Sequence, residues 1–185
     1  MSAVPSVMLP LGTPLPAFSL PNTVDGHQVS SDAAGPHGAL VMFICNHCPY
    51  VVHIRKVLVA LANEATQRGL SVFAINSNSV QTHPQDGPAN MKKLATEERW
   101  AFPFLFDESQ AVAKRFHAAC TPDLFLFDKE QKLVYRGQFD DSRPSNQVPV
   151  SGKDLKGAID AVLAGQPVSP EQRASIGCNI KWHPG

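Results

Sequence analysis

Two cysteines three residues apart, Cys45 and Cys48, are the residues of this chain best suited to carry out chemistry. They follow the apolar run 39–44, which predicts a strand buried on both faces. They precede a segment whose apolar residues recur at helical spacing. The unpaired N–H groups and partial positive charge of a helix start would stabilise a thiolate at Cys45. Cys48, one turn along, could then resolve a mixed disulfide, so the pair is a predicted nucleophile and resolving thiol.

His47 immediately precedes the second cysteine of the pair. A protonated imidazole close to Cys45 would stabilise the thiolate and therefore the reduced form. We therefore predict that His47 tunes the pKa of the site and makes the couple more oxidising. The alternative is a solvated loop histidine. His53 and Arg55, in the first turns of the same helix, are either further sources of positive potential or surface residues.

Several other residues are accessory candidates. Cys120 lies two residues before Pro122, so the fold can bring it near the dithiol, although buried free cysteines are common. Cys178 is a third redox thiol, an anchor for the tail, or inert. Arg136 is either an edge-strand charge or a group that steers a ligand. Pro49, directly after Cys48, is the last of these candidates.

The composition favours one compact domain over residues 1–185, with a C-terminal tail at 166–185. The chain has 185 residues, of which 43% are hydrophobic, and its 16 basic side chains balance its 16 acidic ones. A neutral chain has no basic field to attract nucleic acid or an anionic membrane. The apolar runs are too short to span a bilayer, and the first residues lack the charge of a signal peptide. We therefore expect a cytoplasmic protein, of undetermined oligomeric state.

The order of elements predicts an α/β fold with a mixed central sheet flanked by helices. A strand–helix–strand unit implies parallel central strands, and a late hairpin adds antiparallel edge strands. A capping box at Ser151 and Asp154 is expected to start the last helix. Strands are expected at 18–20, 28–30, 39–44, 70–75, 104–106, 123–127 and 132–135, and helices at 48–68, 89–99, 109–116 and 155–163, with a loop at 80–90.

Four segments together resemble the thioredoxin-like superfamily, over about residues 10–165. They are the Cys-Asn-His-Cys-Pro run at 45–49, the N-terminal phrase 12–20 with Asp25-Gly26, the phrase 120–128, and the strand 133–137. Within the superfamily they resemble the redoxin branch, which includes the AhpC/TSA and TlpA/ResA-like proteins. The resemblance implies a thioredoxin-like fold with an N-terminal redoxin extension. It also implies that Thr121 and a cis Pro122 face the dithiol and shape a groove where a substrate strand pairs through its backbone.

The chain departs from its relatives at informative places. Thioredoxin has Trp-Cys-Gly-Pro-Cys where this chain has Ile44-Cys45-Asn46-His47-Cys48, and the acid that thioredoxin buries behind its dithiol has no match at 40–43. Proton transfer to Cys48 would then rely on His47, another group or water. The resemblance also places His47 where protein disulfide isomerases and DsbA oxidases carry a histidine. A typical peroxiredoxin has Thr-x-x-Cys-Pro, and Cys45 stands at the threonine position.

Three functions follow from these residues. The first is a thiol–disulfide oxidoreductase that acts on protein or small-molecule disulfides with an unidentified electron donor and no cofactor. The second is an AhpC/TSA-type antioxidant peroxidase, which would pass through a sulfenic acid. The third is a soft-metal-binding protein that uses Cys45, His47 and Cys48, with His53 as a further ligand. We expect the first, with no metal at the site.

Overall fold

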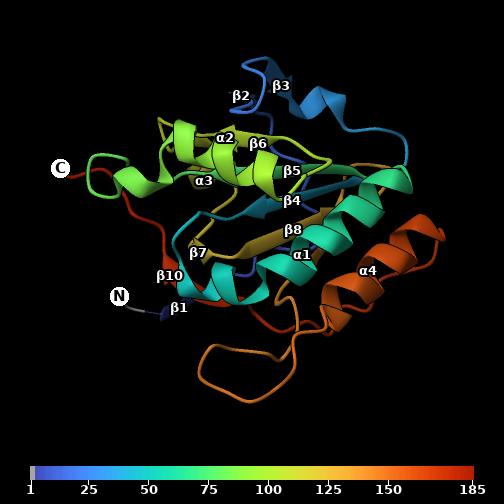
Figure 1. Cartoon of the computed structure of the whole chain (residues 1–185). Helices are drawn as coiled ribbons and strands as arrows, with labels where there is room; N and C mark the ends of the chain where they lie inside the picture. The colour runs from blue at the N-terminus through green and yellow to red at the C-terminus, as the bar shows by residue number, and fades with distance from the viewer. Residues whose placement is uncertain (1–2) are drawn as a thin grey trace.

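The computed structural model describes residues 3–185 and has a five-stranded mixed sheet at its centre. The strand order is β6-β5-β4-β8-β9, in which β4, β5 and β6 are parallel and β8 and β9 are antiparallel to their neighbours (Figure 1). This confirms the predicted mixed sheet, although of the two hairpin strands β8 lies inside the sheet and β9 alone is an edge. The bounds are β4 Ala39–Phe43, β5 Ser71–Asn76, β6 Phe104–Phe106, β8 Asp123–Phe127 and β9 Leu133–Arg136.

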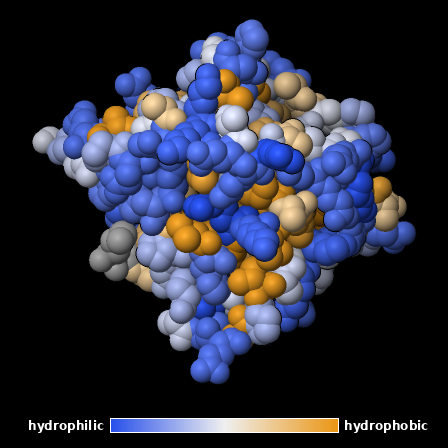
Figure 2. Space-filling view, in the orientation of Figure 1, coloured by the Kyte–Doolittle hydropathy of each residue, from blue (hydrophilic) through white to orange (hydrophobic). Residues whose placement is uncertain are grey.

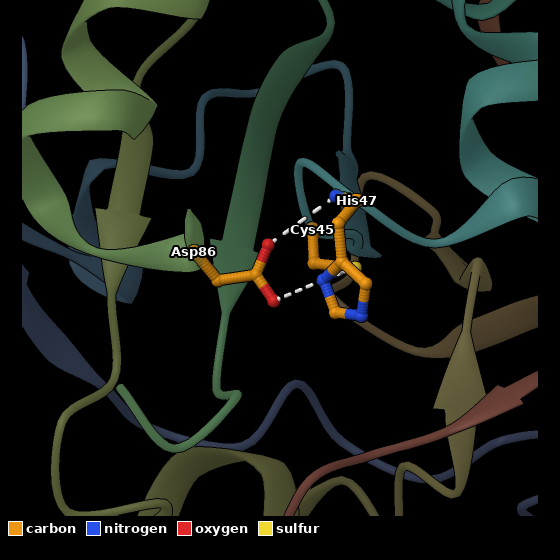
Figure 3. A group of neighbouring side chains, drawn as sticks. All are labelled: Cys45, His47 and Asp86. Carbon is orange, nitrogen blue, oxygen red and sulfur yellow. Dashed lines mark hydrogen bonds and ion pairs between the residues drawn. The ribbon is translucent and has the colours of Figure 1, made fainter. Parts of the chain in front are cut away.

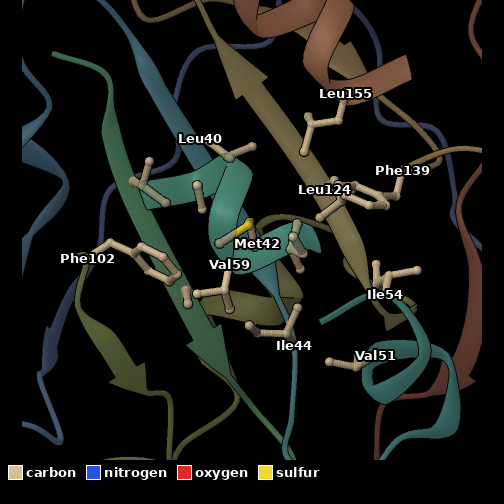
Figure 4. Packing of buried hydrophobic residues seen from close by; sticks show 14 of the residues in the cluster. Leu40, Met42, Ile44, Val51, Ile54, Val59, Phe102, Leu124, Phe139 and Leu155 are labelled. Atoms are coloured by element: carbon tan, nitrogen blue, oxygen red, sulfur yellow. The ribbon is translucent and has the colours of Figure 1, made fainter. Parts of the chain in front are cut away.

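Each face of the sheet carries its own apolar cluster, because alternate residues of β4 point to opposite sides. Leu40 and Met42 face a cluster that includes side chains of α1, α2 and α4 (Figure 4). Val41 and Phe43 face a second cluster with α3 and the N-terminal segment. The helices are α1 Pro49–Gln67, α2 Pro88–Glu97, α3 Ala111–Arg115 and α4 Lys153–Leu163, with short 3-10 turns η1 Ser31–Ala33 and η2 Pro84–Asp86.

Phe116 is the centre of the second cluster and gives a test of the fold. Its fully buried ring contacts the rings of Phe43 and Phe125 edge-on, with centroids 5.3 and 5.5 Å away. Phe116→Ala is expected to lower the free energy of unfolding by about 3–5 kcal/mol, because it removes apolar contacts and leaves a cavity. Urea denaturation measures this loss. Val52→Ala, at a 48% exposed position of α1, is the control and should change stability by less than about 0.5 kcal/mol.

The two ends of the chain meet in a separate three-stranded sheet with the order β1-β10-β7. Its strands are β1 Ala3–Pro5, β7 Cys120–Thr121 and β10 Ile176–Asn179, and both pairings are antiparallel. The segment expected only as a tail therefore contributes a strand, which lies beside the start of α1 in Figure 1. A further hairpin, β2 Ser19–Pro21 with β3 Gln28–Ser30, confirms the predicted N-terminal turn.

The predicted capping box of the last helix is wrong. The helix begins at Lys153, and its N-cap is Gly152 with a left-handed φ of +68°. Asp154 does not turn back to the backbone as a capping box requires, because its carboxylate accepts a hydrogen bond from Gln138 Nε2 at 2.7 Å. Ser151 Oγ accepts instead from the Lys153 N–H at 3.3 Å.

The outer surface is mixed in polarity. Within residues 3–185, no helix combines the length and the apolar character needed to cross a membrane. On the face drawn in Figure 2, polar residues predominate and apolar patches gather near the centre, over the region that α1 crosses in Figure 1. The large apolar side chains with the highest exposure are separated along the chain, and they include Val7 and Val52.

Candidate redox site

The dithiol is positioned by the end of β4 and the start of α1. Residues 44–47 leave the sheet, and Pro49 at the first helical position fixes the helix start with Cys48 as its N-cap. Cys45 therefore lies before the first turn rather than on it. The helix N-terminus acts on Cys48, which corrects our expectation that its field stabilises a thiolate at Cys45.

The loop before β8 forms the opposite wall of the site. The peptide bond between Thr121 and Pro122 is cis, as the resemblance implied. Thr121 contacts both cysteines: Cys45 Sγ lies 3.6 Å from its Oγ1, and the Cys48 thiol donates to its carbonyl oxygen at 3.2 Å. The structure thus brings together Cys45, Cys48, Thr121 and Pro122 from segments more than 70 residues apart, as the resemblance implied.

Asp86 is a functional residue that sequence reasoning missed. It ends η2, its side chain is fully buried, and it approaches the dithiol from a segment we expected to be only a loop. Its carboxylate accepts hydrogen bonds from the Asn46 and His47 backbone N–H groups at 3.0 and 3.3 Å and from Asn78 Nδ2 at 2.9 Å. No local motif marks it, because Asp86-Gly87-Pro88 has the composition of an ordinary turn.

Asp86 also holds the His47 imidazole. His47 Nδ1 lies 2.6 Å from Asp86 Oδ2 and 4.0 Å from Cys45 Sγ (Figure 3). The same nitrogen faces both groups, so its proton is donated to the carboxylate. His47 is thus a half-buried partner of an acid rather than a solvated loop histidine, and Asp86 offsets the positive charge that we expected to act alone on Cys45.

His83 covers the outer side of this pair. Its ring stacks on the His47 ring with centroids 5.0 Å apart. Burial, followed by repulsion from His47, lowers the pKa of His83 below its ordinary value. Neutral His83 therefore separates the His47–Asp86 pair from solvent without adding a charge at neutral pH.

The two thiols of the pair differ in their acidity. Contact with Cys48, then burial, then the Asp86 charge raise the pKa of Cys45 well above its ordinary value. The pKa of Cys48 is lowered, first by the Cys45 thiol, against the effect of burial, and further by Cys178 and the Val51 amide. Because each thiol shifts the pKa of the other, the first proton lost belongs to the pair rather than to one sulfur.

Of the accessory candidates, Cys178 lies near the dithiol, whereas Cys120 and Arg136 are directed elsewhere. Cys178 lies in the apolar cluster that contains Cys45 and Cys48, and it pairs with Thr121 in the sheet. Cys120 turns away, and its thiol donates to the Pro122 carbonyl at 3.5 Å. Arg136 does not reach the dithiol, because its guanidinium donates to the Leu9 carbonyl and to Gln172 Oε1.

His53 and Arg55, the residues of α1 that could have added positive charge or bound a metal, have partners away from the dithiol. His53 Nε2 lies 2.6 Å from Ser142 Oγ, so His53 is engaged away from the dithiol. Arg55 pairs with Glu98 at 2.9 Å and reaches only the Asn46 carbonyl, at 3.4 Å. Pro49 acts as the helix start.

The metal-ligand set of the alternative metal-binding function is not the one that the fold assembles. Ligand atoms of Cys45, His47 and Asp86 lie within 4.8 Å of one another, whereas Cys48 is directed to the Thr121 carbonyl. A metal ion at these three residues would have to displace the hydrogen bond between His47 and Asp86. The arrangement therefore serves better as an acid–imidazole pair next to a thiol.

Neither of two cavities near the surface contains the dithiol. A cavity of about 500 Å³ between β9, α4 and residues 167–173 contains no cysteine or histidine. Beside Pro122, the space enclosed with Tyr50 and Ile176 is only about 20 Å³, too small for a substrate side chain. Both sulfurs are buried, with Cys45 1% and Cys48 0% exposed. Access to the dithiol is therefore controlled by the segments that cover it.

The central mixed sheet, the dithiol at the start of α1 and the cis-proline loop define a thioredoxin-like protein. A model of the AhpC/TSA family matches residues 11–136, more than half of the chain, so the protein belongs to that family. The matched range includes the dithiol, Asp86 and Thr121-Pro122 but ends before β10. A search of the curated proteins gave no match.

Solved structures of similar proteins extend over the whole chain. An uncharacterized conserved protein from Geobacillus kaustophilus is 51% identical with a TM-score of 0.97, covering 100% of this chain and 98% of that one. A hypothetical protein from Sinorhizobium meliloti is 45% identical with a TM-score of 0.94, covering 98% and 99%. The thioredoxin domain of a thiol-disulfide oxidoreductase from Bacteroides vulgatus is 18% identical with a TM-score of 0.64, covering 84% and 99%, and shows the shared fold.

Proposed function

We propose that this protein is a thiol–disulfide oxidoreductase in which Cys45 is the nucleophile and Cys48 the resolving thiol. The main support is the placement of both sulfurs against Thr121, beside a cis proline. Cys45 Sγ lies 3.6 Å from Thr121 Oγ1, and Cys48 Sγ lies 3.2 Å from the Thr121 carbonyl oxygen. Membership of a redox family supports the class of reaction. The substrates would be protein or small-molecule disulfides, and an external dithiol would return the electrons.

Cys45 is the better nucleophile by position. Cys48 is enclosed by the Thr121 carbonyl, Cys45 and Cys178, whereas Cys45 borders His47, whose side chain is 16% exposed. Cys45 attacks a substrate disulfide as its thiolate, and the second substrate sulfur leaves as a thiolate. A bond between Cys45 and the substrate forms as the substrate disulfide breaks.

Resolution requires Cys48 to lose its thiol proton, which the first departing substrate thiolate takes up. Its thiolate then attacks Cys45, the Cys45–Cys48 disulfide forms, and the substrate departs with both electrons as a thiolate. The His47–Asp86 pair lies 4.0 Å from Cys45 and is well placed to stabilise or relay charge during these steps. It takes the place of the buried acid for which β4 has no residue.

The expected docking groove is already filled. The backbone of Thr121 pairs with Cys178 of β10, so a substrate strand cannot add there while β10 is in place. Small disulfides that reach Cys45 past His47 would not need this edge. A protein substrate would have to displace β10, which makes small disulfides the easier substrates of the closed form.

The test is turnover of disulfides with an external reductant. The protein should accelerate reduction of oxidised glutathione and of a protein disulfide by a dithiol, and mild oxidation should yield a Cys45–Cys48 disulfide by peptide mapping. Failure to accelerate either reaction, with metal retained after purification at Cys45, His47 and Asp86, would instead favour a metal-binding protein.

Peroxide is expected to react slowly with the reduced protein. Cys45 stands where a peroxiredoxin carries threonine, and Arg136 is engaged with Leu9 and Gln172 rather than with a peroxide site. Cys48 thus lacks the peroxiredoxin threonine, and Arg136 is not directed to either thiol, so the rate should match that of an ordinary thiolate. Stopped-flow measurement with hydrogen peroxide checks this. A fast reaction that leaves a sulfenic acid would favour the peroxidase instead.

A further inference from the structure

The C-terminal strand β10 lies directly on the cis-proline loop. Cys178 pairs with Thr121 and Asn179 pairs with Cys120 in antiparallel register. A Cβ on Gly177 would lie 2.0 Å from the Thr121 carbonyl oxygen and 3.1 Å from Pro122 N, so only glycine permits this approach. The strand therefore occupies, within the same chain, the edge where a substrate strand would pair.

The side chain of Cys178 faces the dithiol. It is 4% exposed and belongs to the same apolar cluster as Cys45 and Cys48. Its register partner Thr121 is the residue whose carbonyl accepts the Cys48 thiol at 3.2 Å. Burial, followed by contact with Cys48, raises the pKa of Cys178 to about 11. Cys48 thus has a second thiol neighbour besides Cys45.

Cys120 provides the contrast within the same sheet. It is also fully buried, but its thiol donates to the Pro122 carbonyl at 3.5 Å. Burial and the charge of Asp123 raise the pKa of the Cys120 thiol far above its ordinary value. An unreactive buried cysteine therefore lies one strand away from Cys178 and serves as its matched control.

We infer that Cys178 is a third redox thiol, which exchanges with the oxidised dithiol to form a Cys48–Cys178 disulfide. The inference rests on the proposed function, because it needs the Cys45–Cys48 disulfide as its starting point. The Cys178 thiolate attacks Cys48 Sγ, the Cys48–Cys178 bond forms and the Cys45–Cys48 bond breaks. Cys45 leaves as a thiolate and takes up the proton that Cys178 lost. One disulfide is exchanged for another, so no further oxidant or reductant is required.

The exchange has two structural effects. It ties β10 covalently to the start of α1, which keeps the Thr121 edge closed to a substrate strand. It also returns Cys45, the sulfur nearest to His47, to its thiol form while the protein stays oxidised. Oxidation would then lock the C-terminal strand in place and leave one thiol for a small molecule.

The experiment maps disulfides in the full-length protein after oxidation with oxidised glutathione, acid quenching and alkylation. Wild type should contain both Cys45–Cys48 and Cys48–Cys178 linkages. Cys178→Ser should contain Cys45–Cys48 alone, and Cys120→Ser should keep the wild-type pattern. In Cys45→Ser, the Cys48–Cys178 disulfide should accumulate as the main product. Gly177→Ala should lose most of that linkage, since the added methyl group displaces β10 from Thr121.

The disulfide maps distinguish failure of the Cys178 exchange from failure of the proposed function. Detection of Cys45–Cys48 alone in wild type, with no Cys48–Cys178 linkage in Cys45→Ser, would overturn the role of Cys178 and leave the dithiol intact. Should Cys45→Ser fail to fold, the wild-type and Cys178→Ser maps decide the matter. Absence of the Cys45–Cys48 linkage from both wild type and Cys178→Ser would overturn both. A cysteine with a purely structural role would give no linkage to Cys48 in any sample.

Discussion

Cys45→Ser is expected to abolish disulfide turnover, with a loss of at least roughly a thousandfold in rate, because it removes the attacking sulfur. A serine hydroxyl in the same position is not ionised at neutral pH and forms no disulfide. Reduction of oxidised glutathione and of a protein disulfide by an external dithiol, followed at several substrate concentrations, measures the loss. Thermal unfolding should be close to wild type, since the substitution changes one atom.

Cys48→Ser should fail at a different step. Cys45 can still attack, but no thiol resolves its mixed disulfide, so a stable adduct with the substrate should accumulate. Mass spectrometry detects this adduct. Cys120→Ser is the control and should retain wild-type turnover, because its thiol is directed to the Pro122 carbonyl. If Cys45→Ser keeps its activity and Cys48→Ser loses it without forming an adduct, the nucleophile has been assigned to the wrong sulfur.

Substitution of His47 and substitution of Asp86 are expected to shift the reduction potential of the dithiol in opposite directions. His47→Ala removes the Nδ1–H that is donated to Asp86 and leaves the carboxylate charge facing Cys45. That charge destabilises a thiolate, so the reduced form loses stability and the potential should fall. Asp86→Asn removes the charge, so the pKa of Cys45 should fall and the potential should rise.

The size of these shifts follows from the charge that each variant changes. A differential interaction of roughly 0.7–1.4 kcal/mol corresponds to about 15–30 mV for a two-electron couple. Glutathione titration gives the potential, and ultraviolet absorbance of the thiolate against pH gives the pKa. Because Asp86 also accepts backbone N–H groups, Asp86→Asn should cost about 1–3 kcal/mol of stability, measured separately by denaturation.

Two further variants sharpen the comparison. His53→Ala removes a histidine of α1 that bonds to Ser142 and should leave the potential unchanged. A double variant of His47 and Asp86 should return toward the wild-type potential, because the two charges are removed together. Shifts of the same sign in both single variants would show that the pair does not act through its charge.

The central part of the fold follows from local sequence patterns, for a physical reason. The apolar run of β4 and the helical spacing after Cys48 are each sufficient to define an element, and Pro49 fixes where the helix begins. The Thr121-Pro122 phrase could be placed opposite the dithiol only through its resemblance to a known family. These features are local, or tied to motifs, and can be recognised in a single sequence.

The remaining parts of the site depend on contacts that no local pattern encodes. Asp86 reaches the dithiol through a short turn, and only its burial against Asn46 and His47 distinguishes it from a solvated turn residue. The tail strand β10 is four residues long, and burial does not alternate along it, so no alternating pattern marks it as a strand. His47 does not act on Cys45 as an isolated charge, because its Nδ1 lies 2.6 Å from the Asp86 carboxylate.

The position of β10 in the chain also sets an order of events during synthesis. The central sheet, α1 and the Thr121-Pro122 loop are complete in sequence by residue 136, whereas the strand that covers the dithiol begins at residue 176. Synthesis proceeds from the N-terminus, so a nascent chain carries the dithiol and its docking edge before their cover has been made. Before β10 has been synthesised, the dithiol of the nascent chain is therefore exposed to thiols, oxidants and other strands. In the complete fold, β10 covers it.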